Sequence, residues 1–179
     1  MNVFVLSPGR CGSVTLAYAC RHATNFRVGH ETNCRLIGSR RLSYASNFIE
    51  IDNRLTWMLG RLQQAYGDEA WYVHLSRDPE AIAQSYNKRW HIPTGIIPAY
   101  RTGILMNANA KPIDICRDYV TTVSANISEY LKDKSHVLSM TLETMEADFT
   151  RFWDWIGATG DKRAAINELT VVRNTNVAD

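Results

Sequence analysis

Residues 7–15 read Ser7-Pro8-Gly9-Arg10-Cys11-Gly12-Ser13-Val14-Thr15, and the rest of the chain can be understood outward from this stretch. A continuous apolar run over residues 3–6 precedes it, which is typical of a strand buried on both faces of a parallel sheet. Apolar residues after it predict a short helix over residues 13–22. A buried strand, a turn with two glycines and a helix that begins on hydroxyl residues together predict an anion-binding turn.

The residue types of this turn fit a phosphate or a sulfate. Backbone N–H groups of the turn and of the first helical turn converge on one spot, where the helix dipole also favours negative charge. Gly9 and Gly12 allow an anion to approach the backbone closely. Arg10 supplies a fork of donors, and Ser13 and Thr15 supply hydroxyl groups.

The turn departs from the Walker pattern, which asks for a Gly, four residues and then Gly-Lys-Ser/Thr. Gly9 and Gly12 are too close together, and no Lys follows Gly12. From this stretch alone, a plain tight turn after a strand remains an alternative.

The composition describes an ordinary globular protein. The 179 residues suffice for one domain with a sizeable core, and 45% hydrophobic with 21% charged residues exclude a disordered chain. A net charge of +2 is too small to indicate a nucleic-acid partner. Of the 20 basic residues 15 are Arg, the residue type for bidentate oxyanion recognition, although genomic base composition is an alternative cause.

Targeting, disulfide and metal signals are absent from the sequence pattern. The apolar run at residues 3–6 is far too short for a signal peptide or a membrane span. The four cysteines lie far apart without a C-x-x-C pair, which predicts reduced thiols in a cytosolic protein. We find no repeat, low-complexity tract or linker, so we expect a single domain over residues 1–179.

Strand-like and helix-like segments alternate along the chain. Asn53 is expected to cap a helix that Gly67 ends, and Asp78 with Pro79 begins another. The Arg40-Arg41 pair is expected to be solvated. Strands are predicted at residues 2–6, 25–29, 48–51, 71–75 and 136–142, and further helices within 96–106 and 112–131 and at 145–156 and 161–169.

This alternation predicts an α/β fold with a mostly parallel central sheet and helices on both faces. In such sheets ligands lie beyond the carboxyl ends of the strands. The segments to examine for chemistry are therefore residues 9–15, His30 with Glu31, Asp52, and residues 77–85.

The second anion-binding segment comes at the end of another buried strand. Leu75-Ser76-Arg77-Asp78-Pro79, with Ser85 on the helix that follows, resembles the 3′-phosphate-binding segment of PAPS-dependent sulfotransferases. In that family an Arg at a strand end and a Ser on the next helix hold the 3′-phosphate of 3′-phosphoadenosine 5′-phosphosulfate (PAPS). Arg10-Cys11-Gly12-Ser13-Val14 is similar to the family's 5′-phosphosulfate loop, which is usually Lys/Arg-Ser-Gly-Thr-Thr.

The resemblance implies a P-loop-like nucleotide-binding architecture and a set of residues that bind the co-substrate, with three departures from the family pattern. Cys11 replaces a Ser, Val14 replaces the second Thr, and Thr15 stands where many cytosolic members carry an adenine-stacking Trp. Thr15 is a possible substitute for the hydroxyl that Val14 lacks. The implied PAPS-binding residues are Gly9, Arg10, Cys11, Gly12, Ser13, Val14, Thr15, Arg77 and Ser85.

The implied reaction is sulfuryl transfer from PAPS to a hydroxyl or amine of a carbohydrate, lipid or small-molecule acceptor. Such a transfer passes through a loose in-line transition state, so positioning and charge stabilisation supply most of the catalysis, and no metal is expected. Arg10 is the candidate for stabilising the leaving phosphate. Glu31 is favoured over His30 as the general base, because relatives with an Arg-type loop tend to use Glu; Asp52 is a further candidate for orienting the acceptor.

Less functional interpretations remain open. Glu31 could be a solvated carboxylate paired with Arg27 or Arg35, and His30 could bond only to backbone. A P-loop kinase of a small metabolite would share the fold but should carry the Walker Lys. A catalytically inactive nucleotide-binding or scaffold protein is the other alternative, favoured by Val14 and by the short chain.

Overall fold

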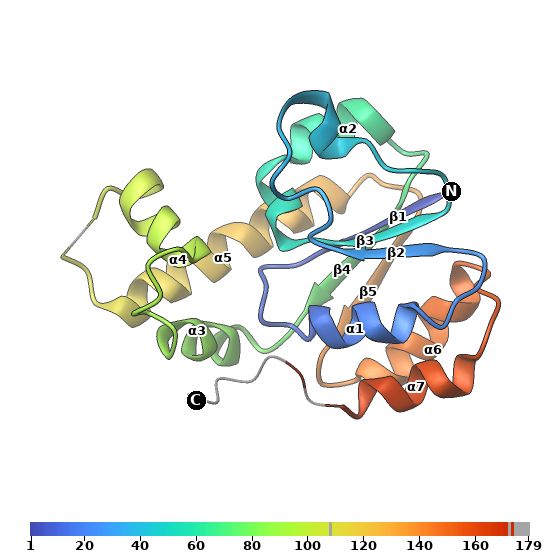
Figure 1. Cartoon of the computed structure of the whole chain (residues 1–179). Helices are drawn as coiled ribbons and strands as arrows, with labels where there is room; N and C mark the ends of the chain where they lie inside the picture. The colour runs from blue at the N-terminus through green and yellow to red at the C-terminus, as the bar shows by residue number, and fades with distance from the viewer. Residues whose placement is uncertain (108, 172, 174–179) are drawn as a thin grey trace.

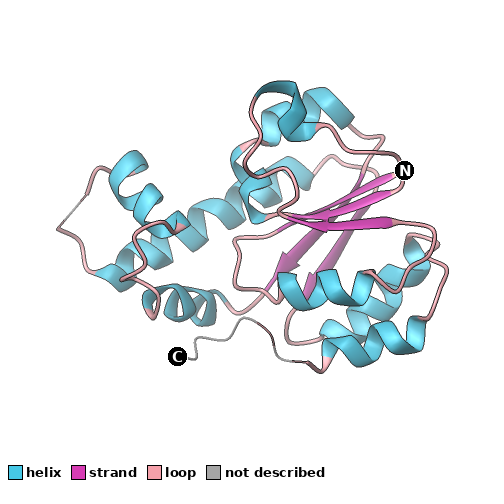
Figure 2. Ribbon diagram, in the orientation of Figure 1, coloured by secondary structure: helices cyan, strands magenta, loops and turns pink. Residues whose placement is uncertain are grey.

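A computed structural model describes residues 1–107, 109–171 and 173 of the chain. Within these residues five strands form one parallel sheet in the order β2-β3-β1-β4-β5 (Figures 1 and 2). The strands are β1 (Asn2–Leu6), β2 (Arg27–His30), β3 (Phe48–Ile51), β4 (Trp71–Ser76) and β5 (Val137–Thr141). The predicted α/β fold is confirmed.

Helices cover both faces of the sheet, as predicted. Figure 1 shows α1, α6 and α7 on one face and α2 on the other, with α5 running beside β4. The α-helices are α1 (Ser13–Cys20), α2 (Leu59–Tyr66), α3 (Pro79–Asn87), α4 (Ile96–Ala99), α5 (Pro112–Leu131), α6 (Met145–Trp155) and α7 (Lys162–Leu169). Two short 3₁₀ helices, η1 (Gly38–Leu42) and η2 (Asn53–Trp57), and a π-helical turn, η3 (Tyr100–Ile104), complete the described chain.

The central strand β1 has no exposed surface from Val3 to Leu6, which confirms a strand buried on both faces. Its side chains alternate between the two helical layers. On one side Phe4 packs on Tyr66 of α2, with ring centroids 4.7 Å apart. Trp71 of β4 pairs with Val3 in the sheet register and faces the other layer. There its ring packs on Trp155 of α6, with ring centroids 4.4 Å apart.

Local capping signals placed most helix starts correctly. Asp78 accepts from the backbone N–H of Ala81 at 2.8 Å with Pro79 at the first helical position, and Asp161 caps α7 through Ala164. The expected cap at Asn53 is wrong, because the carboxylate of Asp52 accepts from the backbone N–H of Arg54 at 2.8 Å instead. The cap therefore lies one residue earlier and begins a 3₁₀ turn, and α2 starts only at Leu59.

The expectation that Arg40 and Arg41 are both solvated is wrong for Arg41. Its side chain is 1% exposed, and its Nη2 lies 2.5 Å from Oδ2 of the equally buried Asp52. Tyr44 accepts a second bond from the same guanidinium. Arg41 therefore fixes η1 and the segment after it against the end of β3.

Replacing Arg41 by Met should lower the free energy of unfolding by about 3–5 kcal/mol, because it leaves the carboxylate of Asp52 buried without its partner. Arg40→Met is the matched control: this exposed neighbour should change stability by less than about 0.5 kcal/mol. Urea denaturation of the two variants measures both values. Equal effects would show that the buried ion pair does not hold this region.

Candidate active site

Two tyrosines, one on α3 and one on α5, fix the loop between β1 and α1 through hydrogen bonds. The backbone carbonyl of Pro8 accepts from the hydroxyl of Tyr86 on α3 at 2.7 Å and from that of Tyr119 on α5 at 3.0 Å. The hydroxyl of Ser7 accepts from the N–H of Gly9 at 3.2 Å. The loop that was predicted to bind an anion is thus anchored to two helices.

The backbone of this loop has the left-handed conformations that form anion-binding concavities. Gly9, Arg10 and Gly12 have φ values of 86°, 61° and 81°. Gly12 is the N-cap of α1 and has no side chain to satisfy the first N–H groups of the helix. Cys11 is buried, and its thiol donates to the carbonyl of Gly9 rather than facing outward.

The two segments predicted to bind phosphates meet in the structure. Nε of Arg10 donates to the hydroxyl of Ser85 at 2.9 Å, across 75 positions of sequence. Nη1 of Arg77 donates to the backbone carbonyl of Arg10 at 3.3 Å. Arg77 and Ser85 therefore lie against the loop after β1, as the sequence patterns require.

Electrostatics identify one further cation that the sequence patterns missed. Burial lowers the pKa of Arg10, and the charges of Arg89 and Arg77 lower it further. Arg89 follows Ser85 by four residues, just past the end of α3, so helical spacing from Ser85 could have found it. Three neighbouring guanidinium groups favour an anionic ligand between them.

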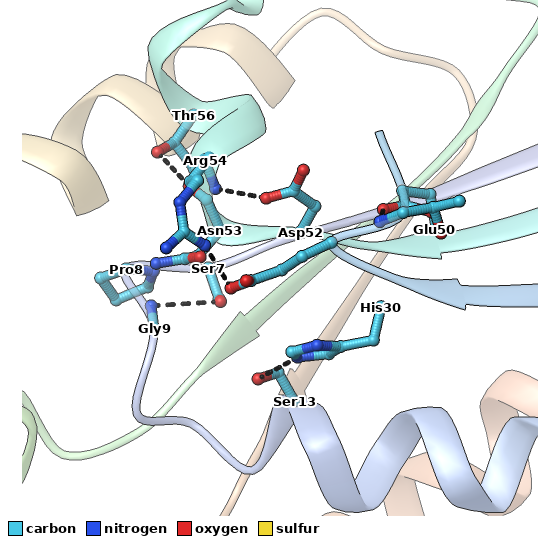
Figure 3. A network of polar contacts seen from close by, with 12 residues as sticks. Ser7, Pro8, Gly9, Ser13, His30, Glu50, Asp52, Asn53, Arg54 and Thr56 are labelled. Atoms are coloured by element: carbon cyan, nitrogen blue, oxygen red, sulfur yellow. Dashed lines mark hydrogen bonds and ion pairs between the residues drawn. The ribbon is translucent and has the colours of Figure 1, made fainter. Parts of the chain in front are cut away.

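The two candidate bases lie beyond the loop, at the end of β2. Nε2 of His30 is 3.2 Å from the hydroxyl of Ser13, and Figure 3 shows the imidazole directed at the start of α1. Burial lowers the pKa of His30, which favours its neutral form. The alternative that His30 bonds only to backbone is therefore wrong, because its ring contacts the hydroxyl of Ser13 at the start of α1.

Glu31 has a different partner from those considered. Its Oε1 lies 2.5 Å from Nη1 of Arg54 on η2, not beside Arg27 or Arg35, and both side chains are partly exposed. Asp52 is buried, and Arg41 and the backbone N–H of Arg54 occupy its two carboxylate oxygens. The expected role of Asp52 in orienting an acceptor is thus replaced by a structural one: it supports Arg54.

Thr15 and Val14 show how this loop differs from the family pattern. The hydroxyl of Thr15 donates to the carbonyl of Val171, at 3.4 Å, after the end of α7. That contact turns the hydroxyl toward the segment after α7. Val14 is only partly buried and lies on the same first turn of α1.

The described residues contain neither a candidate metal-binding cluster nor a candidate membrane-spanning helix. They contain no cluster of three or more His, Cys, Asp or Glu side chains placed to hold a metal ion. None of the helices described here has the length and apolar character needed to span a membrane. All four cysteines are free thiols.

Comparison with known proteins gives a structural likeness only. No protein-family model matches the chain, and no curated protein matches it. Among solved structures it is similar to a sulfotransferase domain from the curacin biosynthetic pathway, with a TM-score of 0.66 over 98% of this chain and 80% of that one. The chain has the fold of that sulfotransferase domain. Because only 9% of the residues are identical, the likeness shows the fold and not the activity.

Gly9 should be the least replaceable glycine of the loop. A Cβ there would lie 2.3 Å from the hydroxyl of Tyr86 and 2.9 Å from Nδ2 of Asn53. Gly38 is the control, because its φ is also left-handed but no atom lies within 4 Å of a Cβ. Gly38→Ala should lower the free energy of unfolding by about 1–2 kcal/mol because of backbone strain. Gly9→Ala should lower it by about 1–3 kcal/mol more because of the added steric clash. Denaturant titration of both variants tests this, and equal losses would contradict the tight fit under Tyr86.

Proposed function

We propose that this protein transfers a sulfuryl group from PAPS to a hydroxyl or amine of an acceptor. The observation that carries the proposal is the contact of Arg10 with Ser85 and Arg77, which brings together two segments that resemble the two phosphate-binding segments of PAPS-dependent sulfotransferases. The likeness of the whole chain to a sulfotransferase domain supports it independently.

In this proposal the nucleotide lies across the loop after β1. Arg77 and Ser85 bind the 3′-phosphate, with Arg89 nearby, and the Ser85 hydroxyl exchanges Arg10 for the phosphate when the nucleotide binds. The backbone N–H groups of residues 10–13, the hydroxyl of Ser13 and the guanidinium of Arg10 bind the 5′-phosphosulfate, while the N–H of Gly9 stays bonded to Ser7. Cys11 and Val14 contribute backbone, since the thiol of Cys11 is turned inward.

The chemical step needs charge stabilisation on one side and proton removal on the other. The acceptor oxygen or nitrogen forms a bond to sulfur while the bond from sulfur to the bridging oxygen of the 5′-phosphate breaks in line with it. Negative charge grows on that phosphate, where Arg10 and the loop N–H groups stabilise it. The acceptor proton passes to a base on the opposite side.

Glu31 is the base in this proposal, and His30 positions the loop. Glu31 stands at the end of β2 with Arg54 fixing one carboxylate oxygen, which leaves the other for the acceptor proton. His30 touches Ser13, so its contact is with the group that holds the sulfuryl donor. The acceptor is a carbohydrate, a lipid or another small molecule.

Nucleotide binding tests the co-substrate. Adenosine 3′,5′-bisphosphate at 100 times its Kd should stabilise the protein by about 2.7 kcal/mol in a thermal-shift series, whereas ATP with Mg²⁺ should not. Arg77→Ala should weaken the binding of adenosine 3′,5′-bisphosphate by about 2–4 kcal/mol, because the 3′-phosphate loses its partner. The affinity for adenosine 5′-monophosphate, which lacks that phosphate, should remain nearly unchanged.

The control is Arg27→Ala. Arg27 is exposed and lies at the amino end of β2, away from the carboxyl ends of the strands, so its replacement should alter neither affinity. Equal losses for both nucleotides in Arg77→Ala would give Arg77 a purely structural role. Stabilisation by ATP with Mg²⁺ would favour a kinase, and no shift with any nucleotide would favour a scaffold protein.

Removal of the base should reduce the rate without affecting nucleotide binding. Glu31→Gln should keep the affinity for adenosine 3′,5′-bisphosphate and lower transfer of labelled sulfate from PAPS about 10²–10⁴-fold, the usual contribution of a general base. The acceptor comes from a screen of sugars, lipids and phenols. His30→Ala should have a smaller effect on the rate. If His30→Ala is inactive while Glu31→Gln transfers at the parent rate, the two roles are exchanged.

A further inference from the structure

A buried carboxyl group lies directly beneath the turn that carries Glu31. Glu50 on β3 is 0% exposed, and its Oε1 accepts from the backbone N–H of Thr32 at 2.7 Å. Gly29 of β2 is its partner in the sheet register. A Cβ at Gly29 would lie 2.6 Å from Oε2 of Glu50 and 1.8 Å from Oγ1 of Thr32. The carboxyl group and the turn therefore fit together only because residue 29 has no side chain.

The turn above Glu50 needs such support. Glu31 has a φ of 54°, a left-handed conformation that side-chain-bearing residues adopt only at a cost in free energy. The sheet holds it at two consecutive N–H groups: that of Glu31 donates to the carbonyl of Ile51 at 3.1 Å, and that of Thr32 donates to Glu50. One of these two anchors is an ionisable side chain.

The surroundings of Glu50 make its charge sensitive to pH. Burial raises the pKa of Glu50, and the nearby charge of Asp52 raises it further. The hydrogen bonds from Thr32 and the charge of Arg41 lower it, and the resulting pKa is about 7. Tyr44 is the other titratable group that faces it. Arg41 is already paired with Asp52, and Oε2 of Glu50 has no hydrogen-bond partner in the described part of the chain.

We propose that Glu50 is a positioning residue for the base: through the N–H of Thr32 it fixes the turn at residues 30–32 and so the direction of the Glu31 carboxylate. This inference rests on the proposed function, because it assigns Glu31 as the base. An ionised acceptor binds an N–H roughly twice as strongly as a neutral one, so the turn is held more firmly when Glu50 is charged. The same ionisation costs global stability. The folded-state pKa of Glu50 lies above its ordinary value, so the contribution of Glu50 to the free energy of unfolding is greatest below pH 4.5 and is lost as the pH rises through about 7.

A measurement on the protein alone tests the contact. The backbone amide resonance of Thr32, followed by NMR between pH 5 and pH 9, should show an inflection near pH 7 that disappears in Glu50→Gln. Titration of His30, two residues away, should remain in both proteins at lower pH, because burial lowers its pKa. Glu146→Gln, an exposed residue on α6, is the matched control and should keep the inflection. An inflection that survives in Glu50→Gln would overturn the proposal.

The rate of sulfuryl transfer tests the positioning role. Glu50→Gln keeps an oxygen that can accept from Thr32, so it should retain most of the transfer rate but lose the pH dependence near 7. Glu50→Leu cannot accept, and its rate should fall about 10- to 100-fold at unchanged affinity for adenosine 3′,5′-bisphosphate. Parent-like rates in Glu50→Leu would contradict the role.

The two measurements separate this inference from the proposed function. If the parent protein transfers no sulfuryl group to any acceptor, the proposed function fails, while the Thr32 resonance still decides whether Glu50 holds the turn. If Glu50→Leu does not fold, the pH profiles of the parent and of Glu50→Gln decide alone. Identical profiles for those two proteins would reject the proposal.

Discussion

The backbone carbonyl of Pro8 accepts two hydrogen bonds on which the architecture of the site depends. The hydroxyls of Tyr86 and Tyr119 both donate to it, and burial raises the pKa of each, so they remain protonated donors. Because Tyr86 is on α3 and Tyr119 on α5, this one carbonyl ties both helices to the end of β1. Ser85 precedes Tyr86, so the same bonds bring it to Arg10. Gly9 completes the arrangement, since only a residue without Cβ fits beneath the Tyr86 hydroxyl.

The parts of the fold that the sequence predicted are those that short-range physics determines. An apolar run such as residues 3–6 is favourable only where both faces of the strand are buried. Asp78 followed by Pro79 indicates a helix start, because Asp caps the helix and Pro suits its first position. The loop of residues 7–12 was predictable for a related reason, because glycines after a buried strand mark a turn with left-handed conformations that other residues rarely adopt. Parallel strands then bring residues at their carboxyl ends to one edge, which is why His30 and Arg77 could be named in advance as neighbours of this loop and of the start of α1.

The parts that the sequence did not predict are partnerships between side chains distant along the chain. Nothing distinguishes Arg41 from Arg40 in the sequence, yet one is buried against Asp52 and the other is exposed, because η1 turns only one of them toward β3. Arg54 was missed as the partner of Glu31. The position of the Arg54 side chain depends on the hydrogen bond by which Asp52 caps η2, and that bond was not predicted. Arg89 was missed because the family pattern names only Arg77 and Ser85 in this segment, although helical spacing places Arg89 one turn beyond Ser85.

The topology separates the two kinds of charge that a group transfer needs. Arg10 and Arg77 follow β1 and β4, where burial and then the neighbouring guanidinium groups lower the pKa of Arg10. On the β2 and β3 side, Arg54 and Arg41 are instead held by the carboxylates of Glu31 and Asp52. The order β2-β3-β1-β4-β5 puts β1 between these halves, so its loop borders both. In the proposed reaction, a donor anion bound on the cationic half would have the carboxylate-bearing half on its other side, which is the arrangement that in-line transfer to a deprotonated acceptor requires.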